Sequence, residues 1–269
     1  MTGEMLWLSV YWKARWKMNR HNEIKNAYRS LGKEATFYDG MITCTTLPGR
    51  AVCGVVWNMG REKNTRYLEK ALSGIPDRFA GRLLEVPVGT GVLTMPVYKT
   101  LPQADITCLD YSPDMMSTAQ RRAKTAGLNN VQFRQGDVGK LPFGDNSFDL
   151  VLSLNGFHAF PDKEAAYQEI YRVLRPGGMF CGCFYVKGEN RRTDWFVDKL
   201  YTPKGFFTPP YETADSLRQR LIGMYAQAMV ETVEAMACFT CKKGYDESDG
   251  TEDKARSIQL PKQNTKFRT

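Results

Sequence analysis

Between residues 82 and 186, short apolar runs alternate with longer segments in which apolar positions recur at helical spacing. We expect the apolar runs to form strands, over residues 82–86, 105–109, 131–134, 148–154 and 179–186. Strands that alternate with amphipathic helices are typical of a parallel sheet with crossover helices. The pattern therefore predicts an α/β fold.

The helices between these strands have recognisable start and stop signals. Ser112 can cap a helix, Pro113 suits its first position, and Gly127 can end it. A second helix is expected over residues 163–174, before the stop signal at 175–178.

The pattern divides the chain into three parts. Residues 1–75 are expected to be an N-terminal extension and a helical cap, and residues 76–243 to be the core. The core is expected to end in a helix over 214–227 and two late strands. Residues 244–269 are polar and poor in aromatic residues, which predicts a disordered tail.

Two other segments stand out against this division. Residues 188–212 are rich in aromatic residues and proline, and we expect them to form a lid over a ligand site or to pack onto the sheet. Residues 5–12 are apolar and are followed by basic residues. They are either an amphipathic membrane anchor or an upstream extension of a protein that begins at Met18.

Composition excludes several classes. The 269 residues carry a net charge of +8, with 42% hydrophobic and 25% charged residues, as in an ordinary globular protein. The basic residues are scattered, so no nucleic-acid partner is expected. No apolar run reaches about 18 residues, so no stable membrane insertion is expected.

Cysteine usage indicates a reducing, cytoplasmic location. The seven cysteines form no regular framework, and no secretory signal is evident. Cys181 and Cys183 form one close pair, and Cys238 and Cys241 another. Four converging thiols could bind zinc. Both pairs fall in apolar, strand-like runs, so we expect buried core thiols and no metal.

Candidate ligand residues follow the first two predicted strands. Gly89 and Gly91 form a turn where the backbone can approach a ligand, next to the free N–H groups of a helix start. Asp110 ends the second strand, where one carboxylate can accept both hydroxyls of a ribose. Each signal has an ordinary alternative, since such a glycine pair is common and Asp110 also flanks the cap residue Ser112.

Further candidates follow the third and fourth strands. Asp137 can accept an exocyclic amine of adenine, and Val138 and Met115 can contact its ring, although Gly-Asp is also an ordinary turn pair. Asn155 and His158 follow the fourth strand, at the edge where open α/β sheets bind ligands.

Taken in order, these segments resemble a known family. The strings are E-V-x-x-G-T-G from 85, L-D-Y-S from 109, Q-G-D-V from 135, L-P-F-x-D-N-S-F-D from 141 and E-I-Y-R-V-L-R-P-G-G from 169. The set is similar to class I S-adenosylmethionine-dependent methyltransferases, above all the ubiquinone/menaquinone biosynthesis group with its methyltransferase type 11 domain. The resemblance covers residues 35–186, and its specificity lies in the ordered set.

The resemblance implies a Rossmann-like, seven-stranded, mostly parallel sheet with helices on both faces. It implies S-adenosylmethionine as the cofactor, S-adenosylhomocysteine as the product and a small, hydrophobic or aromatic methyl acceptor. It assigns cofactor contacts to these residues: Tyr38, Glu85, Pro87, Gly89, Gly91, Thr94, Asp110, Tyr111, Met115, Asp137, Val138, Leu154 and Asn155.

Two prolines depart from the family pattern. Pro87 stands where glycine is common, and it removes an N–H and fixes φ. Pro96 falls inside the helix expected after the glycine turn, which it should kink or shorten. Pro87, together with the lack of a clear base, keeps a non-catalytic S-adenosylmethionine-binding protein open as an alternative.

Catalysis is expected to depend mainly on orientation of the acceptor. His158 is the candidate catalytic residue, although a histidine at this position can also lie against the cofactor. Tyr38, Asp39 and Tyr185 are alternative bases.

Two further functions remain as alternatives. A nicotinamide dehydrogenase would share the glycine turn, but it would favour glycine where Thr94 stands. A methyltransferase for a macromolecule is the other, although residues 155–158 lack the pattern for adenine methylation.

Overall fold

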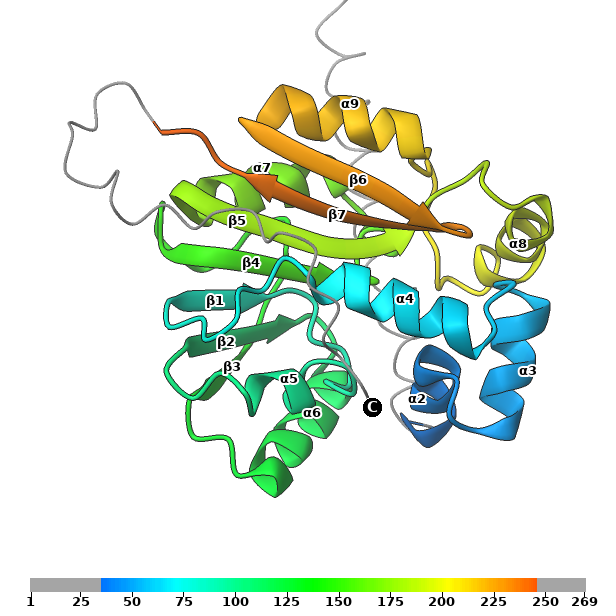
Figure 1. Ribbon diagram of the computed structural model, residues 1–269, viewed down its shortest axis with the longest axis horizontal. Helices are drawn as coiled ribbons and strands as arrows, with labels where there is room; N and C mark the ends of the chain where they lie inside the picture. The colour runs from blue at the N-terminus through cyan, green and yellow to red at the C-terminus, as the bar shows by residue number, and fades with distance from the viewer. Residues whose placement is uncertain (1–34, 246–269) are drawn as a thin grey trace, which may run out of the picture.

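The computed structural model describes residues 35–245 (Figure 1). Within that range, seven strands form one sheet in the order β3-β2-β1-β4-β5-β7-β6, and β7 runs antiparallel to its neighbours β5 and β6. The predicted mostly parallel sheet is confirmed. The strands are β1 (Arg82–Glu85), β2 (Asp105–Asp110), β3 (Val131–Gln135), β4 (Phe148–Leu154), β5 (Leu174–Tyr185), β6 (Gln227–Val233) and β7 (Met236–Lys242).

Helices cover both faces of the sheet and one end of the molecule (Figure 1). They are α2 (Ala35–Thr43), α3 (Leu47–Val55), α4 (Arg61–Leu72), α5 (Met95–Tyr98), α6 (Pro113–Ala126), α7 (Lys163–Val173), α8 (Arg191–Phe196), the π-helix η1 (Val197–Tyr201) and α9 (Ala214–Met224). None of the helices in residues 35–245 is long and apolar enough to cross a membrane.

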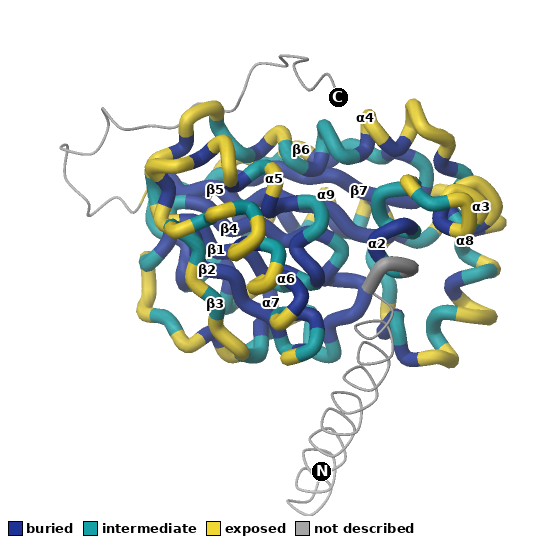
Figure 2. The backbone as a smooth tube through the Cα atoms, turned by 90° about the horizontal axis from the view of Figure 1, so that it is seen from below, coloured by how far each residue is buried: buried dark blue, intermediate teal, exposed yellow. Residues whose placement is uncertain are grey.

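Successive residues of a strand pack into two separate apolar cores, one on each face of the sheet. Leu83 packs with α4 and α6 on one face, whereas its neighbour Leu84 packs with α7 and α9 on the other. Successive side chains of a strand point to opposite faces, so a continuous apolar run fills both cores. Figure 2 shows the result, with buried strands lying between partly exposed helices.

Local signals place α6 and α5 correctly. The Ser112 side chain accepts the Met115 N–H at 3.4 Å, and Gly127 ends α6 with φ +70°. Pro96 lies in the first turn of α5, which has only four residues, so the predicted shortening is confirmed. The glycine turn therefore leads into turns and a short helix, not into a long one.

Two predicted boundaries were wrong because strand pairing overrides local sequence. The last helix ends at Met224 instead of 227, since Gln227 already pairs with Lys242. The stop signal at 175–178 lies within β5. There Gly177 N–H donates to the Lys243 carbonyl at 3.0 Å, which extends the ladder to β7.

The buried cysteines were predicted correctly, but one disulfide was not. Cys183 and Cys238 pair across β5 and β7 in one core, while Cys241 lies in the other, so the four thiols do not converge. A disulfide joins Cys44 at the end of α2 to Cys53 in α3. No spacing rule in the sequence distinguished these two cysteines from the others.

The N-terminal helices and α8 lie together at one end of the molecule (Figure 1). Thr193 Oγ1 donates to the Val56 carbonyl at 2.7 Å, and Arg192 donates to the Gly54 carbonyl at 3.0 Å. These contacts bring the segment before the sheet against the segment after β5. The expectations for residues 1–34, including Met18, and for the tail beyond residue 245 lie outside the described residues.

Candidate functional site

A pocket lies at the edge of the sheet where β1, β2 and β4 end. We call it the glycine-loop pocket, because the turn with Gly89 and Gly91 lines it. Every residue that the family resemblance assigned to the cofactor lines it: Tyr38, Glu85, Pro87, Gly89, Gly91, Thr94, Asp110, Tyr111, Met115, Asp137, Val138, Leu154 and Asn155. Because the carboxyl ends of parallel strands share one edge, positions far apart in sequence converge here.

The glycine turn presents bare backbone to this pocket. Gly89 has φ +55° and Gly91 has φ +68°. A Cβ at Gly89 would meet nothing within 4 Å, so a side chain there would occupy the open space of the pocket. Pro87 follows a cis peptide bond, and a Cβ at Gly156 would clash with its Cδ. The absence of a side chain at Gly156 therefore makes room for Pro87 in the turn.

Asp110 links the glycine turn to the start of α6. Its Oδ2 accepts the Gly89 N–H at 2.7 Å, and its Oδ1 accepts the Ser112 N–H at 2.8 Å. Burial raises the pKa of Asp110 to about 6. Each carboxylate oxygen has a second lone pair, so both oxygens can still accept a hydrogen bond from a ligand.

Glu85 is buried more deeply in the same pocket, with 1% of its surface exposed. The Tyr98 hydroxyl donates to its Oε2 at 2.8 Å. Burial raises the pKa of Glu85 to about 8, although the hydrogen bond from Tyr98 acts to lower it. The carboxyl therefore holds its proton at neutral pH. A cation bound beside it would favour the ionised form.

The lining of the glycine-loop pocket is acidic. It contains the carboxylates Glu85, Asp110 and Asp137, and among the described residues that line it there is no lysine, arginine or histidine. The whole chain, by contrast, has a net charge of +8. This concentration of acidic groups favours a cationic ligand, beside which Glu85 would ionise, and it opposes an anionic ligand.

A polar clasp holds α2 against the glycine turn. Thr90 Oγ1 donates to Asp39 at 2.6 Å, Arg122 forms an ion pair with Asp39, and Arg122 also donates to the Thr90 carbonyl at 2.6 Å. The Asp39 carboxylate is committed to these contacts, which does not favour it as a base. The clasp places the neighbouring Tyr38 at the pocket, where burial and the charges of Asp110 and Asp39 raise its pKa.

A second cavity of about 350 Å³ adjoins the first and shares Tyr38, Ile42 and Asn155 with it. Its walls come from α2, α3, α4 and the segment after α8. We call it the aromatic cavity after its aromatic lining residues: Tyr38, Trp57, Tyr67, Tyr201, Phe206 and Phe207. The sequence pointed to residues 188–212 as a lid over a ligand site, and Tyr201, Phe206 and Phe207 belong to that segment. It did not single out Trp57 or Tyr67, because no spacing pattern connects the N-terminal helices to this segment.

His158 lies in the aromatic cavity and not in the glycine-loop pocket. Its ring stacks on Phe207 with centroids 4.0 Å apart, and its Nδ1 accepts the Tyr185 N–H at 3.4 Å. Burial, together with the nearby Lys163, lowers the pKa of His158 to about 3. The ring is therefore neutral, with its proton on Nε2, which does not favour the general-base role expected from the sequence. Tyr185 donates its own hydroxyl to Asp194 at 2.7 Å.

Asn155 stands where the pocket and the cavity meet. It has φ +55°, and its N–H donates to the Cys183 carbonyl at 2.7 Å. Its side-chain Oδ1 accepts the Tyr67 hydroxyl at 3.0 Å. With the amide in this orientation, the two N–H groups of Nδ2 are left for another acceptor.

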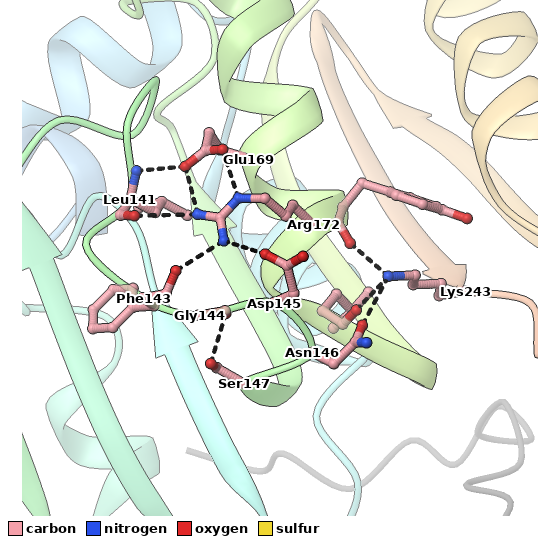
Figure 3. A network of polar contacts seen from close by, with 11 residues as sticks. Leu141, Phe143, Gly144, Asp145, Asn146, Ser147, Glu169, Arg172 and Lys243 are labelled. Carbon is pink, nitrogen blue, oxygen red and sulfur yellow. Dashed lines mark hydrogen bonds and ion pairs between the residues drawn. The ribbon is translucent and has the colours of Figure 1, made fainter. Parts of the chain in front are cut away.

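Two of the recognised sequence strings hold a loop in place and do not line the pocket. Arg172 donates to the carbonyls of Leu141 at 3.2 Å and Phe143 at 2.8 Å, and it pairs with Asp145 at 2.7 Å (Figure 3). The strings that begin at Leu141 and Glu169 are therefore bound to each other by structural contacts, although both helped to indicate the family.

Comparison with known proteins agrees with this geometry. Residues 83–178 match a family model described as a methyltransferase domain. Demethylmenaquinone methyltransferase of Thermus thermophilus is 37% identical over 113 residues, which cover 42% of this chain and 51% of the relative. The protein of the same name from Staphylococcus aureus is 35% identical over 119 residues, or 44% and 48% of the two chains. The chain thus spans about half the length of these curated relatives.

Solved structures share the fold at lower identity. A SAM-dependent methyltransferase from Thermotoga maritima matches with a TM-score of 0.56 and 18% identity, over 81% of this chain and 99% of that one. The cyclase SpnF matches with a TM-score of 0.59 and 18% identity, over 80% and 96% of the two chains. A cyclase and a methyltransferase thus share this architecture, so function must be argued from the site.

Proposed function

We propose that the protein transfers the methyl group of S-adenosylmethionine to a small acceptor, because residues 83–178 match a family model described as a methyltransferase domain. The cofactor would occupy the glycine-loop pocket and the acceptor the aromatic cavity. One observation carries the proposal: an acidic pocket with a bare glycine turn opens into an aromatic cavity at Tyr38, Ile42 and Asn155.

The lining residues fit this cofactor. Asp110 can accept the two ribose hydroxyls while keeping its bonds to Gly89 and Ser112. Met115 and Val138 offer an apolar strip for the adenine ring beside Asp137. The same lining fits NAD poorly, because a pyrophosphate would bring negative charge to a surface whose described residues include carboxyl groups and no lysine, arginine or histidine.

The amino and sulfonium groups of the cofactor are cationic, and the pocket offers Glu85 to them. With a pKa of about 8, Glu85 gives up its proton readily when a positive charge binds beside it. Tyr98 keeps its hydrogen bond to the carboxylate in both states. The residue thus matches the charge of the ligand without leaving a buried anion in the free protein.

Transfer to the acceptor depends on alignment of the two sites. S-adenosylmethionine supplies a methyl group on a sulfonium, which is already activated for displacement. The chain's own contribution is to hold the acceptor against Asn155 and Tyr38 and to exclude water with the aromatic rings. Such orientation can contribute about 7–11 kcal/mol to lowering a barrier.

The acceptor is proposed to be small and aromatic or hydrophobic. The cavity walls support this, and so does the name of the curated relatives, which act on demethylmenaquinone. We also propose that residues 35–75 serve as a cap on the core of residues 76–243, and that residues 188–212 serve as a lid, because both segments contribute to the cavity walls.

Calorimetry tests the proposal. S-adenosylhomocysteine should bind with one site per chain, and NAD should show no heat of binding under the same conditions. Binding of NAD in preference to S-adenosylhomocysteine would overturn the assignment. Binding without turnover across a broad panel of acceptors would instead favour the non-catalytic alternative.

A further inference from the structure

The aromatic cavity and the glycine-loop pocket carry opposite electrostatic character. Among the described residues that line the aromatic cavity, Lys204 is the one charged side chain, and there is no aspartate or glutamate. Within residues 35–245, the lining of the neighbouring pocket has three acidic side chains and no basic one. The glycine-loop pocket therefore suits a cationic cofactor, and the lining of the aromatic cavity tolerates a negatively charged ligand.

The buried polar groups of the aromatic cavity are arranged as donors. Because His158 Nδ1 accepts a backbone N–H from Tyr185, the ring proton is on Nε2, which makes no hydrogen bond within residues 35–245. Because Asn155 Oδ1 accepts the Tyr67 hydroxyl, its Nδ2 is the free end of the amide. Both nitrogens can donate to a bound molecule, and neither can take a proton from it.

The orientation of these donors is fixed by the residues around them. The His158 ring is 7% exposed and is held flat on Phe207. The Tyr67 hydroxyl also contacts Cys183 Sγ at 3.1 Å, so it is anchored from two sides. Burial raises the pKa of Tyr67, so it keeps its proton and remains a donor to Asn155.

We propose that the aromatic cavity selects a planar acceptor that binds as an oxyanion, and that His158 Nε2 and Asn155 Nδ2 donate hydrogen bonds to it. The proposal rests on the methyltransferase function proposed above and names its substrate class. His158 is then a binding residue for the acceptor and not a base.

The charge balance of the step follows. An electron pair of the bound anion forms the bond to the methyl carbon, and the carbon–sulfur bond breaks with its pair left on sulfur. The negative charge of the acceptor and the positive charge of the sulfonium cancel. No proton has to move during transfer, which agrees with a cavity whose described lining residues include a neutral histidine and no aspartate or glutamate.

Three probes of matched shape test the substrate class. They are 4-nitrophenol at a pH where it is ionised, its neutral methyl ether 4-nitroanisole, and 4-nitrobenzylamine in its protonated form. Affinities are measured with the protein saturated by S-adenosylhomocysteine. The phenolate should bind more tightly than the ether, and the ammonium probe should bind least. An ether that binds as tightly as the phenolate, or a preference for the ammonium probe, would overturn the proposal.

Substitutions then identify the donors. His158→Phe keeps a ring on Phe207 and removes the N–H, so it should weaken phenolate binding about 10- to 100-fold. Affinity for the ether should stay within about twofold. His158→Gln, which restores an N–H donor, should recover part of the loss. Equal weakening of phenolate and ether by His158→Phe would indicate a packing role only and would contradict the assignment.

An exposed position gives an independent measurement that does not depend on folding of the His158 variants. Lys204→Met should weaken phenolate binding about two- to fivefold. Lys199→Met, on the same segment but outside the cavity lining, is the matched control and should change nothing. If Lys204→Met leaves phenolate affinity unchanged, the cavity is not tuned to an anion.

The two proposals fail in different ways. Absence of S-adenosylhomocysteine binding would remove the methyltransferase assignment itself. Normal binding of S-adenosylhomocysteine with no preference for the phenolate would remove only the oxyanion inference.

Discussion

The glycine-loop pocket and the aromatic cavity share Tyr38 and Asn155, yet different kinds of structural element line them. The pocket consists of backbone turns and carboxylates at the ends of strands that the sheet fixes in place. The cavity consists of side chains from helices and from the segment around η1, which lie together only because those segments dock. The pocket is acidic, and the cavity has Lys204 as its charged lining residue.

The difference indicates that the two sites bind different kinds of ligand. A site fixed by sheet hydrogen bonds suits a ligand that never changes, such as a cofactor. A site made by docked helices can be altered without disturbing the sheet, which suits the variable partner of a reaction. Substitutions in one region should therefore affect one ligand and spare the other.

The strongest separation is expected at Asp110. Asp110→Ala removes an acceptor for two ligand hydroxyls, and it leaves the N–H groups of Gly89 and Ser112 without their partner. Hydrogen bonds to charged groups contribute about 1.5–3 kcal/mol, so the dissociation constant of S-adenosylhomocysteine should rise about 10- to 150-fold. Calorimetry measures it. Asp105→Asn, at the exposed start of the same strand, is the control.

The next largest effect is expected in the pH dependence of ligand affinity in the glycine-loop pocket. Glu85 has a pKa of about 8 in the free protein and binds a cation only when ionised. As the pH falls from 8 to 7, the ionised fraction drops, and affinity for S-adenosylhomocysteine should fall about fivefold. Glu85→Gln should remove this slope and leave a weaker one near pH 6, where Asp110 titrates. An affinity that rises as the pH falls would contradict the role of Glu85.

Tyr67→Phe should produce a smaller effect, confined to the aromatic cavity. The variant frees the Asn155 amide to rotate, because its Oδ1 loses the hydroxyl donor. Loss of one neutral hydrogen bond predicts about a threefold weaker affinity for 4-nitrophenolate. S-adenosylhomocysteine affinity should stay within error, and Arg66→Gln on the exposed side of α4 should change neither. A large loss of cofactor affinity would show that the two regions are not separable at Asn155.

The smallest loss of affinity is expected from substitution of Arg122, and it should affect the ligands of both regions. Arg122→Gln weakens the clasp to Asp39 and so loosens Tyr38, which lines both sites. A partly exposed ion pair contributes little, so about a twofold loss is expected for each ligand. The neighbouring Arg121→Gln, on the exposed face of α6, is the control. An effect on one ligand only would mean that α2 serves a single site.

The sequence predicted the pocket far better than the cavity, for a physical reason. Gly89, Asp110 and Asp137 each follow a strand, and the rule that strand ends share an edge brings them together without any knowledge of distant contacts. Trp57 and Phe207 face each other only because α3 docks near η1, with ring centroids 6.1 Å apart. No periodic signal connects two such positions.

The features that the sequence did not reveal have the same origin. The chemistry of His158, the candidate catalytic residue, depends on the Tyr185 N–H, which comes from another strand. The end of α9 was placed three residues too late because pairing of Gln227 with Lys242 outweighs helix propensity. The Cys44–Cys53 disulfide depends on how α2 and α3 pack. Each outcome required a long-range contact or a packing arrangement that the local sequence does not encode.

A crystal structure of the protein soaked with S-adenosylhomocysteine tests the central claim most directly. The ribose hydroxyl oxygens should lie within hydrogen-bonding distance of the Asp110 carboxylate, with the adenine between Met115 and Val138 and the sulfur facing the aromatic cavity. Density for the ligand in the aromatic cavity, or an empty glycine-loop pocket at a saturating concentration, would contradict the account.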